Sequence, residues 1–129
     1  MKNKINKSPC IGIIGVGNIA NDHAKSLIDT GFKIVCCAGS PGSTNAKTFA
    51  EKYKIDKVFY DANELLENEN QYDCLLVACS TQPTLEILKL ASRLNKPILV
   101  EKPITLNHRD FSSLNLENNS IRVGYNRRF

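Results

Sequence analysis

A glycine turn near the start of the chain constrains the fold more than any other feature of the sequence. From Gly15 to Ala20 it reads Gly-Val-Gly-Asn-Ile-Ala, which is G-x-G-x-x-A, and it stands between an apolar run and an amphipathic stretch. Gly15 permits a tight turn, Gly17 lets the backbone approach a pyrophosphate, and Ala20 allows a helix to pack closely on a strand. The amides of Asn18 and Ile19 would face the phosphates. The turn therefore predicts a dinucleotide-binding site; the alternative is a strand-to-helix turn with a structural role alone.

Along the rest of the chain, short β-rich apolar runs alternate with amphipathic stretches, as in βαβ units around a parallel sheet. The predicted fold class is therefore α/β, a doubly wound parallel sheet (Rossmann fold) of about six strands. These strands are expected at residues 10–16, 33–38, 58–60, 74–78, 97–100 and 121–125.

Helical spacing predicts the crossovers between the strands. Helices are expected at residues 19–28, at 44–53, in a short stretch after 61, in a longer one that begins near 81–83, and at 110–114, with a loop at 116–120. Gly31 would be the left-handed C-cap of the first helix, and Asp61 with Glu64 the capping box of the third. The fourth, which Thr81 and Pro83 open, carries an apolar stripe of Leu85, Leu88, Ala91 and Leu94, joined by Ile87 and Leu90.

Ligands of such sheets bind in the crevice at the carboxyl ends of the strands, where the winding direction reverses. The loops after the first and fourth strands bound this crevice, so residues 15–20 and 79–83 are expected to face one another across it. An acidic residue about 20 positions after the glycine turn normally binds the adenosine ribose, and this chain lacks one. Side chains that could accommodate a 2′-phosphate follow instead: Ser40, Ser43, Thr44 and the more distant Lys47. The expected cofactor is NAD or NADP, with a slight lean to NADP; the alternative for this segment is a plain glycine-rich surface turn.

The run from Val100 to Pro103, Val-Glu-Lys-Pro, closes the fifth strand and should project into the same crevice. Lys102 could bind nicotinamide or substrate oxygens there, and it could transfer a proton if its surroundings lowered its pKa. Taken alone, Glu101, Lys102 and Pro103 are more typical of a solvated strand end.

Length and composition limit the alternatives. At 129 residues the chain should form one domain at 10–129 after a flexible leader at 1–9. The net charge is +4 without a clustered basic face, so no nucleic-acid partner is expected. Five cysteines, an odd number without CxxC or Cys/His spacing, indicate buried thiols, a cytoplasmic location and no metal site. No apolar run approaches a membrane span.

Three motifs in order resemble one family, the Gfo/Idh/MocA oxidoreductases, over residues 10–129: the glycine turn, Glu101-Lys102-Pro103, and Val-Gly-Tyr-Asn-Arg-Arg-Phe at the C-terminus. The resemblance implies NAD(P)-dependent oxidation or reduction of hydroxyl and carbonyl groups on a sugar- or polyol-like substrate. It implies that Lys102 lies beside nicotinamide and substrate and assists proton transfer, with Glu101 at the cofactor. It also implies that the cofactor cleft is lined by Ser80, Thr81 and Pro83. The nicotinamide end of the cofactor would be approached by Tyr125, Asn126 and Arg127, and Arg127 would also contact the substrate.

Two departures from the family matter for function. Thr84 stands where members often carry a histidine, and the sequence stops at Phe129, where the family's second domain, with the substrate pocket and a catalytic histidine, would follow. That domain is expected to be absent, and neither His108 nor His23, both expected on the surface, replaces its histidine. The chain alone should bind cofactor with little or no catalysis, because half of the site is missing. The alternative is a non-catalytic nucleotide-binding or partner-docking module. The sequence is compatible with a homo-oligomer as well as with a monomer.

Overall fold

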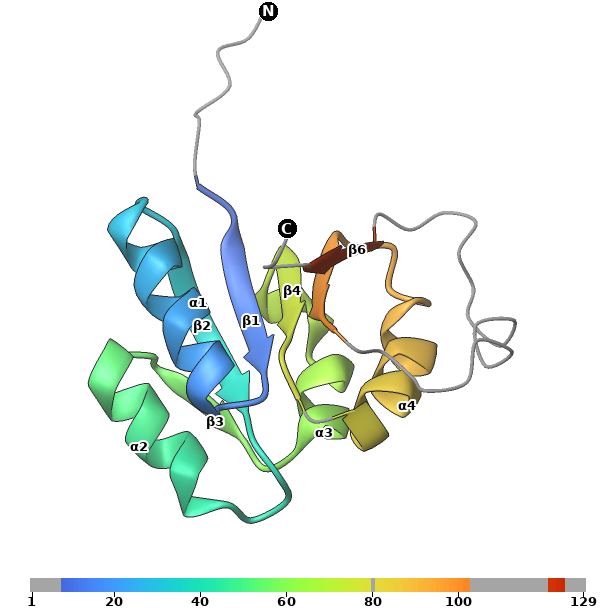
Figure 1. Ribbon diagram of the computed structural model, residues 1–129, viewed down its shortest axis with the longest axis horizontal. Helices are drawn as coiled ribbons and strands as arrows, with labels where there is room; N and C mark the ends of the chain where they lie inside the picture. The colour runs from blue at the N-terminus through green and yellow to red at the C-terminus, as the bar shows by residue number, and fades with distance from the viewer. Residues whose placement is uncertain (1–7, 80, 103–120, 125–129) are drawn as a thin grey trace, which may run out of the picture.

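The sheet is the organising element of the structure, a computed structural model that describes residues 8–79, 81–102 and 121–124 (Figure 1). It has six strands in the order β3-β2-β1-β4-β5-β6, and each neighbouring pair is parallel. The strands are β1 (Cys10–Ile14), β2 (Lys33–Ala38), β3 (Lys57–Phe59), β4 (Cys74–Val77), β5 (Ile98–Glu101) and β6 (Ile121–Gly124). The order reverses direction between β1 and β4, so the predicted doubly wound Rossmann fold is confirmed.

Helices cover both faces of the sheet (Figure 1). They are α1 (Asn18–Asp29), α2 (Thr44–Tyr53), α3 (Ala62–Glu67) and α4 (Thr81–Ala91), with a 3₁₀ turn, η1 (Glu69–Gln71), before β4. Two apolar clusters separate the faces: α1 and α2 pack with Ile13 and Leu76, whereas α3 and α4 pack with Ile14 and Leu75. Successive residues of a strand point to opposite faces, which is why β1 and β4 are apolar throughout.

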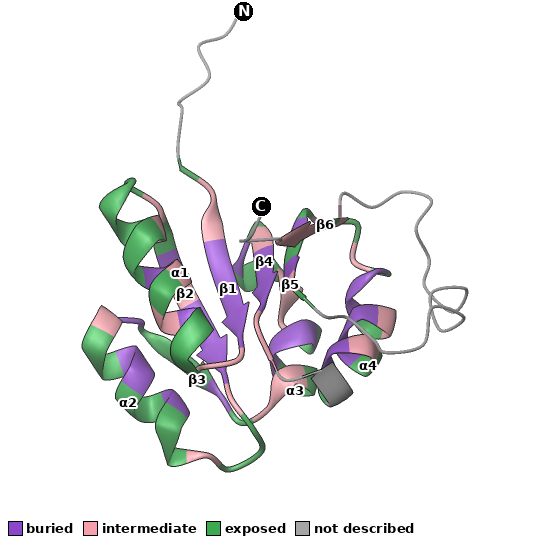
Figure 2. Ribbon diagram, in the orientation of Figure 1, coloured by how far each residue is buried: buried purple, intermediate pink, exposed green. Residues whose placement is uncertain are grey.

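The centre of the sheet is the most buried part of the molecule (Figure 2). Ile13, Val77 and Val100 have no exposed side-chain surface, and Ala20 and Ala24 bring α1 equally close to the strands. Small residues on the buried side of α1 permit this approach, as the sequence predicted for Ala20. The loops at the carboxyl ends of the strands therefore project from a closely packed core.

Side-chain caps start two of the helices. The Ser43 hydroxyl accepts a hydrogen bond from the Asn45 amide at 3.0 Å, and the Asp61 carboxylate accepts one from the Glu64 amide at 2.9 Å. The predicted capping box is therefore half right. The Glu64 carboxylate accepts from the amide of Tyr60 at 2.7 Å, one residue before the expected Asp61, because the chain enters the helix with Tyr60 turned toward it.

The predicted boundaries agree with the observed ones to within two residues for the strands, and residues 44–53 are helical as predicted. The C-cap of α1 is Thr30, and Gly31 follows it with φ +94°, so the predicted positive φ is confirmed one residue beyond the cap. Leu90 is wrong as a member of the apolar stripe of α4: it is 41% exposed, because it lies on the outer side of the helix. The predictions for leader residues 1–7, the helix at 110–114, the loop at 116–120 and the strand end at Tyr125 lie outside the described residues.

Candidate functional site

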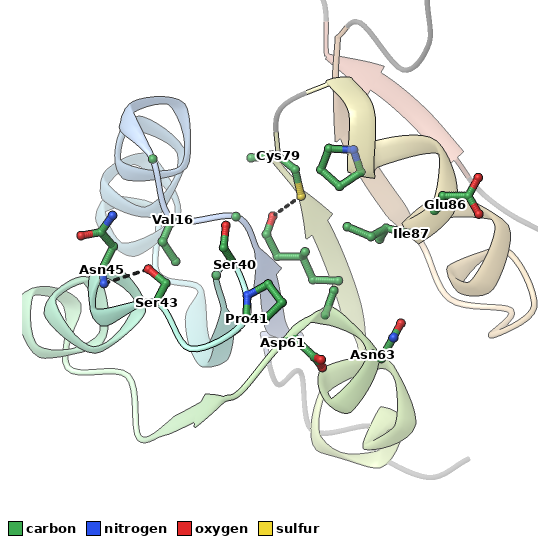
Figure 3. A pocket seen from close by; sticks show the side chains of 17 residues that line it. Val16, Ser40, Pro41, Ser43, Asn45, Asp61, Asn63, Cys79, Glu86 and Ile87 are labelled. Carbon is green, nitrogen blue, oxygen red and sulfur yellow. Dashed lines mark hydrogen bonds between the residues drawn. The ribbon is translucent and has the colours of Figure 1, made fainter.

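A cavity of about 780 Å³ opens at the carboxyl ends of β1, β2 and β4 (Figure 3). This volume lies in the range of small-molecule and cofactor sites. Its walls come from the glycine turn, the β2–α2 loop, the start of α3, the segment after β4, and α4. The lining residues are Ile14, Gly15, Val16, Gly17, Gly39, Ser40, Pro41, Ser43, Asn45, Asp61, Ala62, Asn63, Ala78, Cys79, Pro83, Glu86 and Ile87. The cavity thus lies at the predicted crevice, where residues of 15–20 and of 79–83 share one space.

Gly15 makes the turn possible. It has φ +105°, and a Cβ on it would lie 2.3 Å from the carbonyl oxygen of Ala78. Its amide donates to the Ala38 carbonyl at 2.8 Å, and the Ala78 amide donates to the Ile14 carbonyl at the same distance. The chain therefore passes between the ends of β2 and β4 at a separation that only glycine allows.

Gly17 lies beyond this tight passage and faces open space. A Cβ on it would meet no atom within 4 Å, and its φ of −85° suits any residue. Gly17 is also the N-cap of α1, which has no side-chain cap. The first amides of a helix lack partners within the helix, so the amides of Asn18 and Ile19 are available to an anion in the cavity.

The charged side chains among the described lining residues are acidic and would not attract an anion. Among the described lining residues there is no lysine or arginine, and the two acidic ones are Asp61 and Glu86. Burial raises the pKa of the Cys79 thiol from 9.0 to about 11, so the thiol is neutral at pH 7. Its Sγ lies 3.7 Å from the Ile14 carbonyl (Figure 3). Among these lining residues, attraction for a phosphate comes from backbone amides and the dipole of α1.

The loop after β2 forms the other end of the cavity. Ser40 and Ser43 line it, whereas Thr44 and Lys47 do not. A Cβ on Gly39 would lie 3.1 Å from Val16, so this loop packs directly against the glycine turn. β2 ends without a carboxylate, as the sequence indicated.

Glu101 lies away from the cavity and bonds to α1. Its Oε1 is 2.6 Å from Nε2 of His23, with 11% and 25% of the two side chains exposed. A Cβ on Gly124 would lie 3.3 Å from the same oxygen. The prediction that His23 is a plain surface residue is wrong, because α1 turns it toward the end of β5. Lys102 follows with an exposed side chain and does not line the cavity.

The structure therefore brings together some of the predicted site residues and not others. Gly15, Gly17, Ser40 and Pro83 line one cavity, whereas Asn18 and Ile19, the first two residues of α1 after Gly17, are not among its lining residues. Thr84, at the family's histidine position, is buried and does not line it. Ser80, Asn126 and Arg127 lie outside the described residues, as does the side chain of Thr81.

Sequence reasoning missed the contribution of α3, whose first residues, with Asp61 before them, close the cavity. A signal was available: β3 neighbours β2, so the loop after β3 must lie at the same edge of the sheet.

Across the described part of the chain, no helix is long and apolar enough to cross a membrane. The same residues contain no group of three His, Cys, Asp or Glu side chains that could hold a metal.

Comparison with known proteins agrees with this geometry. A sequence model of an oxidoreductase family with an NAD-binding Rossmann fold matches residues 10–118. The myo-inositol 2-dehydrogenase of Thermotoga maritima is 31% identical over 123 residues, which are 92% of this chain and 36% of that protein. The scyllo-inositol 2-dehydrogenase (NAD(+)) of Bacillus subtilis is 30% identical over 123 residues, 91% of this chain and 35% of that protein.

Among solved structures, the myo-inositol dehydrogenase of Lactobacillus casei in complex with NAD(H) and myo-inositol has the same fold, with a TM-score of 0.80 at 22% identity. The match covers 92% of this chain and 37% of that one. The chain spans about a third of the length of the curated relatives it matches.

Proposed function

The chain belongs to the Gfo/Idh/MocA family of oxidoreductases, as an NAD-binding Rossmann domain, and from this premise we propose that it holds the nicotinamide cofactor of a dehydrogenase acting on a sugar- or polyol-like hydroxyl group. The observation that carries the proposal is the open space over Gly17, beside the cavity and at the N-terminus of α1. Relatives named as inositol dehydrogenases support the substrate class.

The residues present fit a dinucleotide. Its pyrophosphate would lie over Gly17 and accept hydrogen bonds from the amides of Asn18 and Ile19, with the dipole of α1 favouring the negative charge. Ser40 would contact the adenosine ribose, and Pro83 would flank the cofactor from the opposite wall. No lining cation in the described residues is needed for this arrangement, since charge-assisted bonds from backbone amides are strong.

The chemistry would be completed beyond β5. When bound, the nicotinamide ring would accept or give the hydride. Lys102 would bind the reacting oxygen of the substrate and move a proton at it, as its exposed position after the strand end allows. Glu101 would contribute at the cofactor by holding this strand end in place. Asn126 is proposed to contact the cofactor and Arg127 the substrate.

We further propose that NADP is accepted at least as well as NAD. A carboxylate at the end of β2 would bind the ribose 2′-hydroxyl and repel a 2′-phosphate. β2 ends at Ala38, and Gly39 and Ser40, which follow it, carry no carboxylate. Of the two acidic residues that line the cavity, Asp61 and Glu86, Asp61 is the nearer in sequence to this loop, and its carboxylate accepts a hydrogen bond from the Glu64 amide. The hydroxyls of Ser40 and Ser43 can donate to a phosphate.

The experiment is a calorimetric titration of the chain with NADH and with NADPH. We expect saturable binding of both, with NADPH no weaker than NADH. Gly17→Asp should weaken both by more than about 100-fold, because it places a carboxylate against the pyrophosphate in a backbone that otherwise tolerates a side chain. Absence of binding to either nucleotide, with the chain folded, would overturn the proposal.

A further inference from the structure

Asn21, in the first turns of α1, bonds to the glycine turn in a way that no motif requires. Its side-chain Nδ2 donates to the carbonyl oxygen of Gly17 at 2.9 Å. The backbone amide of Asn21 donates to that same oxygen at 3.0 Å. The Gly17 carbonyl therefore accepts two hydrogen bonds from one residue.

The other end of the Asn21 amide is held by α2. The Tyr53 hydroxyl lies 2.8 Å from Oδ1, and Nζ of Lys52 lies 3.3 Å from it. Lysine only donates, so this end of the amide must be the oxygen and the opposite end the NH₂ group. Tyr53 is in turn fixed by its ring, whose centroid is 5.0 Å from that of the buried Phe49. The orientation of the Asn21 amide is therefore fixed by Tyr53 and Lys52, and Tyr53 is itself held against the buried Phe49.

This contact controls the peptide that would meet the cofactor. In a planar trans peptide the carbonyl and the amide point in opposite directions, so fixing the Gly17 carbonyl along the helix directs the Asn18 N–H outward from its N-terminus. Glycine has the greatest backbone freedom, and α1 has no side-chain cap to restrict it. The second donor from Asn21 restricts this freedom.

We infer that Asn21 is a positioning residue for pyrophosphate binding, and that Tyr53 and Lys52 let α2 pre-order the glycine turn through it. The inference rests on the proposed function. It predicts that the loss of Asn21 weakens ligands that carry phosphates and spares ligands that bind through the adenosine alone, whereas a residue that only stabilises the fold would affect both equally.

The test is an NMR titration of the ¹⁵N-labelled chain with ADP and with adenosine, which carries no phosphate. Asn21→Ala should weaken ADP by about 3- to 10-fold, the range expected for one hydrogen bond, and leave adenosine within about two-fold. Tyr53→Phe, which keeps the ring and removes the hydroxyl, should weaken ADP in the same direction by less. Thr30→Ala is the matched control, because it removes a side-chain bond to the Ser26 carbonyl at the opposite end of α1; it should change neither affinity.

If Asn21→Ala lowers the affinity for ADP and for adenosine equally, or lowers neither, the inference is overturned. The proposed function still stands in that case, provided that the unsubstituted chain binds ADP and NADH. If the unsubstituted chain binds neither ADP nor NADH, the proposed function fails and this inference fails with it.

Discussion

The imidazole of His23 lies against the carboxylate of Glu101, with Nε2 and Oε1 2.6 Å apart, and this contact joins α1 to the end of β5. Gly124 on β6 leaves the room that the carboxylate occupies. Three elements that are distant in sequence therefore meet at one side chain. Since Lys102 is the next residue, the contact also fixes the strand end from which the proposed proton-transferring lysine projects.

Removing this carboxylate should destabilise the fold. We expect Glu101→Ala to lower the free energy of unfolding by about 1–3 kcal/mol, because it leaves a half-buried imidazole without its partner. Urea denaturation measures the change. Glu86→Ala is the control: Glu86 pairs with Lys89 on the surface, where such pairs contribute little, so its unfolding curve should be unchanged. Equal effects of the two substitutions would show that the His23 contact contributes nothing.

The two glycines of the turn should separate folding from binding. Gly15→Ala meets both a positive φ and the Ala78 carbonyl, so we expect a loss of about 3 kcal/mol or failure to fold. Gly17→Ala has room and an ordinary φ, so thermal unfolding followed by circular dichroism should be unchanged while NADH binds more weakly. A Gly15→Ala variant as stable as the unsubstituted chain would contradict the observed passage between β2 and β4.

Ser43 offers a test of cofactor preference that spares the fold. Aspartate is as good an N-cap as serine, so Ser43→Asp should keep the cap of α2 and the thermal midpoint. Its charge at the proposed ribose end should lower the affinity for NADPH relative to NADH by about tenfold. Ser43→Ala, the control, should lose about 1 kcal/mol of stability without changing the ratio. A ratio unaltered by Ser43→Asp would place the 2′-phosphate elsewhere.

Cys79 should report on occupancy of the cavity through its reactivity. Only the thiolate is alkylated, and burial raises the pKa of Cys79 to about 11, so at pH 7 to 9 its alkylation should be slower than in the unfolded chain and should rise about tenfold per pH unit toward pH 11. Saturating NADH should slow it further, because Cys79 lines the cavity. Peptide mass spectrometry after iodoacetamide treatment separates Cys79 from Cys10, which lies outside the cavity. Equal protection of both would point to a general tightening of the fold.

The sequence allowed the sheet and one wall of the site to be predicted for a physical reason. Continuously apolar runs such as residues 74–78 need helices on both faces, and parallel strands place their carboxyl ends at one edge. The glycine turn, Ser40 and Pro83 were therefore expected at the same crevice. Strand ends were predicted one or two residues too long at Val16 and Ala78, because small apolar residues suit a strand and the turn after it equally.

Contacts between elements were beyond the sequence pattern. His23 and Glu101 are 78 positions apart, and Asn21 and Tyr53 are 32 apart. Whether they meet depends on how α1 is rotated over the sheet and how α2 lies beside it, and periodicity identifies only the buried side of each helix. Leu90 shows the same limit, since helical spacing alone did not distinguish the edge of the apolar stripe of α4 from its centre.

The most direct test of the cofactor-domain assignment is a map of amide shifts in the ¹⁵N-labelled chain as NADH is added. We expect the largest shifts at Gly15, Gly17, Asn18 and Ile19, with a second group at Gly39 and Ser40, all at the walls or edge of one cavity. Shifts that centre elsewhere, or an unchanged spectrum at saturating NADH, would contradict the assignment.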